Sequence, residues 1–212
     1  MNKSETIQKL LGCGVIGVIR GSSVEEAVKL SKACADGGIV GLEVTFTVPG
    51  AKEVIEELSK DANASYIVGA GTVLDAATAR IATLAGAKFI VSPNFDKDVC
   101  ELCNLYKIPY MAGVFTINEI VAALKAGVEV CKIFPGSLAG PDYIKAIHGP
   151  LPQADCMPTG GVDLNNVEEW IKKGAVAVGT GSNLTAPAKH GDFAKVTELA
   201  KEYVALVAKA RN

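Results

Sequence analysis

The sequence predicts an α/β fold, a (β/α)8 TIM barrel with an extra N-terminal helix. Eight short apolar segments alternate with amphipathic segments at intervals of about twenty residues, a pattern typical of βα units and a parallel sheet. An open, doubly wound sheet is the alternative fold, and it favours a G-x-G-x-x-G fingerprint after the first strand. The residues there, Arg20-Gly21-Ser22-Ser23, do not supply that fingerprint, so we prefer the closed barrel.

The expected elements follow from the apolar runs and the residues that flank them. Capping residues are expected to open helices at Ser22 or Ser23, Asp75, Thr116 and Asp163. Glycines are expected to end them, at Gly37-Gly38, Gly86, Gly127 and Gly174. The expected strands span residues 15–20, 41–46, 65–69, 88–92, 110–113, 129–134, 155–159 and 175–179. A further helix over residues 4–11 precedes the first strand and is expected to cover the bottom of the barrel.

Composition limits the domain organisation and the partners. With 212 residues, 49% hydrophobic and 21% charged, the chain predicts one packed domain over residues 1–212. The net charge of -2 and the lack of a basic cluster argue against a nucleic-acid partner. The N-terminus shows no signal-peptide pattern, and no apolar stretch reaches the ~18 residues that span a bilayer. We therefore expect a cytoplasmic protein without a membrane partner.

The cysteines and histidines bear on metal and redox chemistry. The six cysteines lie scattered through apolar segments, which predicts reduced, buried thiols. Cys100 and Cys103 have the C-x-x-C spacing of some metal sites, but no second cysteine pair follows. The two histidines, His148 and His190, lie away from the predicted strand ends. We therefore expect no metal and no cofactor, and a zinc-dependent mechanism is disfavoured.

Lys132 is the most informative residue, because it interrupts the apolar run at 130–134. In a strand, Val130, Lys132 and Phe134 share one face, so the amine is expected to enter an interior layer. Removal from water favours the uncharged amine, which can attack a carbonyl carbon to form a Schiff base. The alternative is a lysine that extends to solvent from a strand end, as Lys88 is expected to do at the start of its own strand.

Other polar residues are expected at the C-terminal ends of strands, where barrels of this kind place their sites. Glu43 in the second strand suits a general acid/base beside Lys132, although a structural ion pair between the two is equally compatible with the sequence. Arg20 suits a carboxylate, and the alternative is a salt bridge at the rim. Thr72 follows two glycines that let a ligand approach, or that simply form a tight turn.

Two glycine-rich segments follow the last two strands. They are Pro158-Thr159-Gly160-Gly161-Val162-Asp163 and Gly179-Thr180-Gly181-Ser182-Asn183. Backbone N–H groups exposed by glycine at these positions form the usual phosphate cradle of the fold. The sequence therefore predicts a phosphate site here.

The chain resembles a known family in five segments that occur in order over nearly its whole length. They are similar to the signature segments of 2-keto-3-deoxy-6-phosphogluconate (KDPG) aldolase, which is grouped with 4-hydroxy-2-oxoglutarate (KHG) aldolase. The segments are Leu42-Glu43-Val44-Thr45, Val68-Gly69-Ala70-Gly71-Thr72-Val73, Ile90-Val91-Ser92-Pro93, Lys132-Ile133-Phe134-Pro135 and Pro158-Thr159-Gly160-Gly161.

The resemblance implies a metal-independent class I aldolase that cleaves a keto-acid sugar phosphate to pyruvate and glyceraldehyde 3-phosphate. Cleavage of 4-hydroxy-2-oxoglutarate to pyruvate and glyoxylate is a further implied activity, and a homotrimer is the implied assembly. Lys132 matches the Schiff-base lysine and Glu43 the residue that moves protons. Thr72 and Pro93 match the pyruvyl end of the site. The phosphate end is matched by Thr159, Gly160, Gly161, Gly181 and Ser182.

One position departs from the family pattern. Many members carry an arginine shortly after the strand-two glutamate, where this chain has Thr47. That arginine helps to hold the substrate carboxylate. We expect Arg20, at the end of the neighbouring strand, to take its place.

Other functions remain open at this point. A galactonate-series aldolase would differ only in its preference at C4. A non-catalytic sugar-phosphate-binding barrel would keep the glycine loops and use Lys132 structurally. A phosphosugar isomerase or epimerase would turn over substrate without forming an imine that borohydride can trap.

Overall fold

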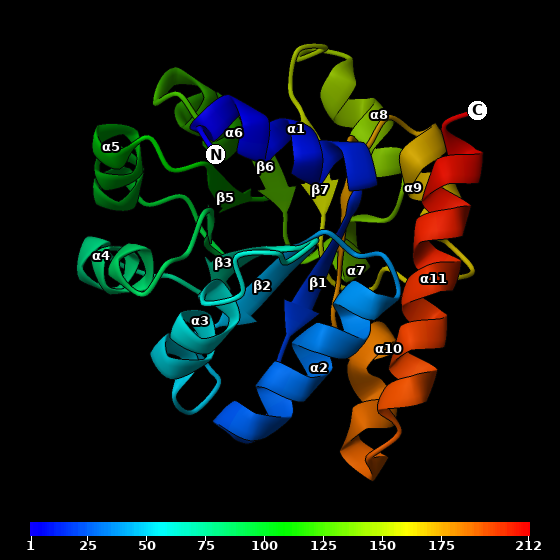
Figure 1. The fold of residues 1–212 in the computed structure, drawn as a ribbon. Coiled ribbons are helices and arrows are strands. Elements are labelled where there is room, and N and C mark those ends of the chain that lie inside the picture. The colour runs from blue at the N-terminus through cyan, green and yellow to red at the C-terminus, as the bar shows by residue number, and fades with distance from the viewer.

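The computed structural model describes residues 1–212 and shows a barrel of parallel strands surrounded by helices (Figure 1). The strands form one sheet in the order β7-β6-β5-β4-β3-β2-β1-β8. A parallel bridge between Thr159 and Gly179 joins the two outer strands of this order, so the sheet closes on itself. The predicted (β/α)8 barrel is confirmed, and the open doubly wound alternative is wrong.

Strands and helices alternate along most of the chain. The strands are β1 (Val15–Ile19), β2 (Gly41–Thr45), β3 (Ile67–Gly71), β4 (Ile90–Val91), β5 (Tyr110–Val114), β6 (Val130–Ile133), β7 (Cys156–Pro158) and β8 (Val178–Thr180). The helices are α1 (Lys3–Cys13), α2 (Val24–Asp36), α3 (Ala51–Ser59), α4 (Ala76–Leu84), α5 (Lys97–Tyr106), α6 (Ile117–Lys125), α7 (Gly136–Ala139), α8 (Asp142–His148), α9 (Val167–Lys172), α10 (Ser182–Thr185), the 3-10 helix η1 (Ala186–His190) and α11 (Phe193–Ala210).

The third strand lies two residues further along the chain than expected, at Ile67–Gly71 and not 65–69. Gly69 and Gly71 both belong to the strand, and neighbouring side chains fill the space beside them. A Cβ on Gly69 would lie 2.4 Å from the Phe89 ring, and one on Gly71 would lie 2.1 Å from the Glu43 carboxylate. Glycine within a strand here marks the close approach of a neighbouring side chain.

The predicted helix starts are confirmed at three positions and wrong at one. Ser23, Asp75 and Thr116 directly precede α2, α4 and α6, and each accepts a hydrogen bond from the backbone N–H three residues on. Asp163 does not cap α9, which begins later, at Val167. Its carboxylate accepts the N–H groups of residues 165 and 166, so it closes a tight turn ahead of the helix.

Two hydrophobic clusters fill the molecule. The larger one lies between the strands and the surrounding helices. The smaller one fills the barrel interior with Leu10, Ile16, Ile67, Phe89, Val91, Met111, Val130, Met157 and Ala177. Leu10 comes from α1, which crosses the N-terminal ends of the strands at the top of Figure 1. The expected covering helix is therefore present, slightly longer than residues 4–11.

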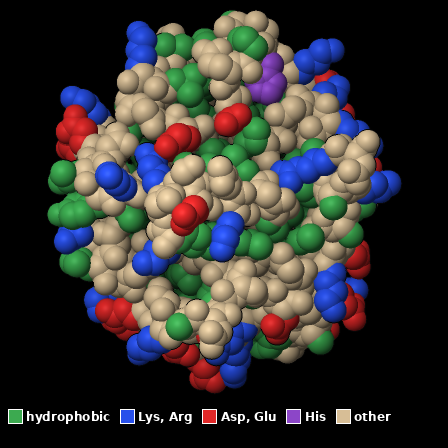
Figure 2. Space-filling model, turned by 45° about the horizontal axis from the view of Figure 1, so that its top comes forward, with side chains coloured by type: hydrophobic (Ala, Val, Ile, Leu, Met, Phe, Trp, Pro, Cys, Tyr) green, Lys and Arg blue, Asp and Glu red, His purple; other side chains and the backbone are tan.

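Charges of both signs are mixed on the surface, and the cysteines are unpaired. On the face drawn in Figure 2, Lys and Arg side chains lie among Asp and Glu side chains without forming a large patch of one sign. All six cysteines are free. Burial raises the pKa of Cys34, Cys103 and Cys156 to about 12. None of the helices has both the length and the apolar character that a membrane crossing requires.

Leu10 offers a test of the packing at the barrel bottom. We expect Leu10→Ala to lower the free energy of unfolding by about 3 kcal/mol, because it opens a cavity under a fully buried side chain. Gly12→Ala is the matched control in the same helix, since a Cβ there meets no atom within 4 Å. Urea unfolding of both variants measures the effect. A loss below about 1 kcal/mol for Leu10→Ala would show that α1 does not seal the interior.

Candidate active site

Lys132 lies within β6 and its side chain enters the barrel. Val130, two residues earlier, belongs to the interior cluster, whereas Cys131 and Ile133 belong to the cluster under the helices. Lys132 is only 5% exposed. Lys88, two residues before β4, is exposed. The predicted inward orientation of Lys132 is confirmed, and the alternative of a solvated strand-end lysine is wrong for this residue.

Glu43 lies opposite Lys132 across the barrel interior. It comes from β2 and is 1% exposed. Lys132 Nζ lies 3.4 Å from Glu43 Oε1, and the second oxygen, Oε2, is buried without a hydrogen-bond partner. A buried acceptor without a partner is costly, so a purely structural ion pair leaves this atom unexplained. An unpaired carboxylate oxygen can hold a water molecule or accept a proton from a ligand.

Gly71 provides the room for this carboxylate. It lies at the end of β3, in register with Thr45 on β2. A Cβ at this position would lie 2.1 Å from Glu43 Oε1 and 2.5 Å from its Cγ. Any larger residue would therefore displace Glu43 from its position beside Lys132. The glycine within an apolar strand run was the sequence signal for this role, but the sequence does not show which side chain fills the space.

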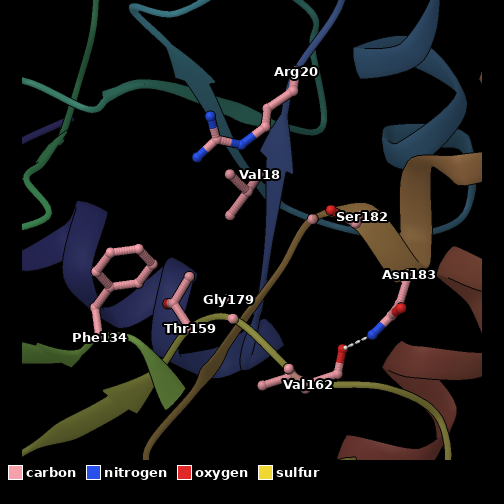
Figure 3. A pocket seen from close by; sticks show the side chains of 11 residues that line it. Val18, Arg20, Phe134, Thr159, Val162, Gly179, Ser182 and Asn183 are labelled. Carbon is pink, nitrogen blue, oxygen red and sulfur yellow. Dashed lines mark hydrogen bonds between the residues drawn. The ribbon is translucent and has the colours of Figure 1, made fainter. Parts of the chain in front are cut away.

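A pocket of about 330 Å³ lies at the C-terminal ends of β7, β8 and β1 (Figure 3). It contains six of the residues that the sequence predicted for substrate binding, namely Arg20, Thr159, Gly160, Gly161, Gly181 and Ser182. The other lining residues are Val162, Gly179 and Asn183, which belong to the two glycine-rich segments but were given no role from the sequence, and Val18 and Phe134, which lie outside them. The structure thus brings the two glycine-rich segments and Arg20 around one cavity.

The backbone at this pocket is arranged to present N–H groups. Gly160 and Gly161 have φ values of 87° and 75°, in the left-handed region where a side chain is strained. No backbone hydrogen bond within the protein uses the N–H of either glycine. Thr159 Oγ1 is buried and also lacks a partner. Successive free N–H groups beside an unpaired hydroxyl form a suitable concavity for an anion.

Arg20 extends along the rim of this pocket. Its Nη1 donates to Thr47 Oγ1 at 3.0 Å. Thr47 lies 2.8 Å from Thr45 Oγ1, which donates to the Ile19 carbonyl. The guanidinium is thus held by a hydroxyl and not by a carboxylate, so the alternative of a rim salt bridge is wrong. Its remaining donors can serve a ligand.

Phe134 connects the pocket to the buried amine. Its ring centroid lies 5.2 Å from Lys132 Nζ, and the same ring lines the pocket. The strand alternation had already placed Phe134 on the face of Lys132, so the signal was present although the residue was not chosen. The Phe134 ring therefore lies between the buried amine and the pocket.

Thr72 and Pro93 lie at the ends of β3 and β4 and do not line the pocket. Thr72 has a φ of 56°, which is rare for a β-branched residue and is found mainly at constrained functional positions. The backbone of Pro93 packs on Gly113, where a Cβ would lie 2.1 Å from the Pro93 carbonyl carbon. Gly113 is in register with Lys132 on the next strand. Pro93 therefore packs against β5, the strand next to the one that carries the amine.

The chain holds no group of three or more His, Cys, Asp or Glu side chains arranged to bind a metal ion. His148 lies on α8, where its Nε2 is 3.0 Å from the Ala154 carbonyl oxygen.

Comparison with known proteins gives one consistent family. A family model described as KDPG and KHG aldolase matches residues 6–199. The 2-dehydro-3-deoxy-phosphogluconate aldolase of Treponema pallidum is 36% identical over 197 residues, which cover 91% of this chain and 93% of the relative. Among solved structures, the KDPG aldolase of Zymomonas mobilis ZM4 with 3-phosphoglycerate has a TM-score of 0.86 at 30% identity and covers 95% of each chain.

A second solved structure bears on the chemistry. The KDPG aldolase of Legionella pneumophila, with pyruvate captured as a covalent carbinolamine intermediate, has a TM-score of 0.82 at 32% identity. The alignment covers 89% of this chain and 92% of that one. Together with the closed barrel and the match over residues 6–199, these similarities show that the chain belongs to the KDPG and KHG aldolase family.

Proposed function

We propose that this protein is a class I aldolase that cleaves 2-keto-3-deoxy-6-phosphogluconate to pyruvate and glyceraldehyde 3-phosphate. The observation that carries the proposal is the buried amine of Lys132, 3.4 Å from a Glu43 carboxylate that retains one unpaired oxygen. The carbinolamine captured in the Legionella relative is the chemistry that such an amine performs on pyruvate. Residues 1–212 would act as one barrel domain.

In the first step, the uncharged amine of Lys132 attacks the C2 ketone of the substrate. Loss of water from the carbinolamine gives an iminium, which withdraws electrons from the neighbouring bonds. The apolar residues below Lys132, such as Val130 and Met157, exclude water from the amine.

In the second step, Glu43 takes the proton of the C4 hydroxyl, directly or through a water molecule. The C3–C4 bond then breaks, its electron pair passes to the iminium, and glyceraldehyde 3-phosphate leaves. The resulting enamine is protonated at C3 by the same carboxyl group, and hydrolysis of the imine releases pyruvate and restores Lys132. Glu43 Oε2 suits this role because no protein group occupies it.

The ends of the substrate are held away from the bond that breaks. The N–H groups of Gly160 and Gly161 would bind the phosphate, together with Thr159, Gly181 and Ser182 around the same pocket. Thr72 and Pro93 would contact the pyruvyl end. Binding energy from the phosphate end would then orient C2 against the amine. No group in this scheme requires a metal ion.

Two related substrates share this mechanism. The galactonate-series compound differs at C4, where Glu43 acts, and 4-hydroxy-2-oxoglutarate lacks the phosphate. Steady-state assays on the three compounds rank them by kcat/KM. The cradle in the pocket of about 330 Å³ would serve the phosphate, which favours the two phosphorylated compounds over 4-hydroxy-2-oxoglutarate.

Covalent trapping tests the proposed function. We expect sodium borohydride with pyruvate to add one reduced pyruvyl group to the protein, to abolish activity, and to fail with Lys132→Met, because only the buried amine forms the imine. Mass spectrometry of the intact protein measures the adduct. EDTA should leave activity unchanged.

Lys88→Met is the matched control, because Lys88 is an exposed lysine of the same barrel. It should trap pyruvate as the unmodified protein does. Trapping that persists in Lys132→Met would place the nucleophile elsewhere. Turnover of the phosphorylated substrate without any trapping would favour an isomerase, and neither turnover nor trapping would favour a binding protein.

Arg20 is proposed as the anchor of the substrate carboxylate. We expect Arg20→Ala to raise the pyruvate concentration needed for half-maximal trapping by about tenfold or more, since a lost charged hydrogen bond costs roughly 1.5–3 kcal/mol. Arg80→Ala is the control, because Arg80 stacks on Tyr106 at the outer surface. An unchanged half-saturation in Arg20→Ala would contradict the assignment.

We also propose a homotrimer in the cytoplasm. Apolar side chains of the adjacent helices α4 and α5 are unusually exposed, including Leu84 at 69% and Leu105 at 75%. Such a surface suits contact with further copies of the chain. The six free cysteines suit a reducing compartment.

Light scattering should give three times the chain mass of 22.0 kDa. Leu84→Glu combined with Leu105→Glu should lower the mass, whereas Lys201→Glu on α11 should not. A monomeric unmodified protein, or a trimer that tolerates both glutamates, would contradict this interface.

A further inference from the structure

One side chain joins the two segments that enclose the anion pocket. Asn183, in α10 after β8, donates from Nδ2 to the carbonyl oxygen of Val162, in the loop after β7, at 2.9 Å (Figure 3). Both residues line the pocket. The hydrogen bond therefore connects two walls of the pocket, the loop after β7 and α10.

Two asparagine side chains hold the loop after β7 at the peptide that follows Val162. The peptide between Val162 and Asp163 is held at its carbonyl by Asn183 and at its N–H by Asn166, whose Oδ1 lies 3.0 Å from the Asp163 nitrogen. Asn166 Nδ2 also donates to the Gly161 carbonyl at 2.8 Å. Since the C=O and N–H of a trans peptide point in opposite directions, a held carbonyl fixes the direction of its N–H.

The two asparagines have different effects. Asn166 belongs to the same loop, so its bonds shape the loop internally. Asn183 belongs to α10, on the opposite side of the pocket. Its bond to Val162 therefore fixes the distance between α10 and the N–H groups of Gly160 and Gly161. Ser182, the residue next to Asn183, lies in the same wall.

We propose that Asn183 is a positioning residue for the phosphate end of the substrate. By tying α10 to the loop after β7, it sets the width of the anion pocket, and it acts on phosphate affinity and not on imine formation. The inference rests on the proposed function for the identity of the substrate. Asn183 itself need not touch the phosphate.

The test compares Asn183→Ala with the unmodified protein in two assays. Loss of one hydrogen bond predicts that the Kd for 3-phosphoglycerate, measured by titration calorimetry, rises about five- to tenfold. KM for the phosphorylated keto acid should rise by a similar factor, with kcat unchanged within about twofold. Half-saturation of borohydride trapping by pyruvate, which carries no phosphate, should not change.

The variant is expected to fold, because the Val162 carbonyl keeps a second donor. Tyr203 Oη on α11 lies 3.4 Å from the same oxygen. Asn183→Gln retains the amide donor and should recover part of the affinity. Asn165→Ala is the matched control, since the Asn165 side chain is exposed in the same loop and only its backbone N–H takes part in a hydrogen bond.

The outcomes separate this inference from the proposed function. Unchanged 3-phosphoglycerate affinity in Asn183→Ala, or equal losses for pyruvate and 3-phosphoglycerate, would overturn the positioning role. Absence of 3-phosphoglycerate binding by the unmodified protein would also overturn it, even if pyruvate is trapped. If pyruvate is not trapped but 3-phosphoglycerate binding depends on Asn183, the aldolase proposal fails and the positioning role stands.

Discussion

The burial of one amine and one carboxylate inside the barrel is the constraint on which the rest of the structure depends. Moving such groups out of water is costly, and their mutual attraction repays the cost only where the geometry is good. Here Lys132 and Glu43 meet at 3.4 Å from opposite sides of the interior. The apolar layer below them, closed by Leu10 of α1, keeps water from reaching them from the N-terminal end. Gly71 leaves the space that the carboxylate fills.

Two regions with different chemistry lie next to each other in the barrel. The buried pair lies above an apolar layer of side chains, which excludes water from the nucleophile. The pocket at β7 and β8 is built from backbone N–H groups and hydroxyls, which suits a permanent anion. Phe134 lies between them, with its ring at the pocket wall and 5.2 Å from the amine. A substrate with a keto group at one end and a phosphate at the other would span both regions.

Much of this arrangement could be predicted from the sequence, because it follows from local patterns. The period of two in β6 was enough to place Lys132 inside the barrel, and the order of the strands was enough to bring the two glycine-rich segments together. What could not be predicted depends on contacts between distant segments. Nothing near Gly71 in sequence indicates that Glu43 fills its space, and nothing near Asn183 indicates that it bonds to Val162. The predicted start of α9 at Asp163 was wrong, because Asp163 forms a turn with residues 165 and 166 ahead of the helix.

The most direct test of the account is a crystal structure of the protein after a pyruvate soak. We expect continuous electron density from Lys132 Nζ to C2 of pyruvate, with Glu43 Oε2 holding a water molecule or the ligand, and with the ligand carboxylate near Arg20. Pyruvate bound elsewhere, or a Lys132 side chain that reaches solvent with no ligand attached, would contradict it.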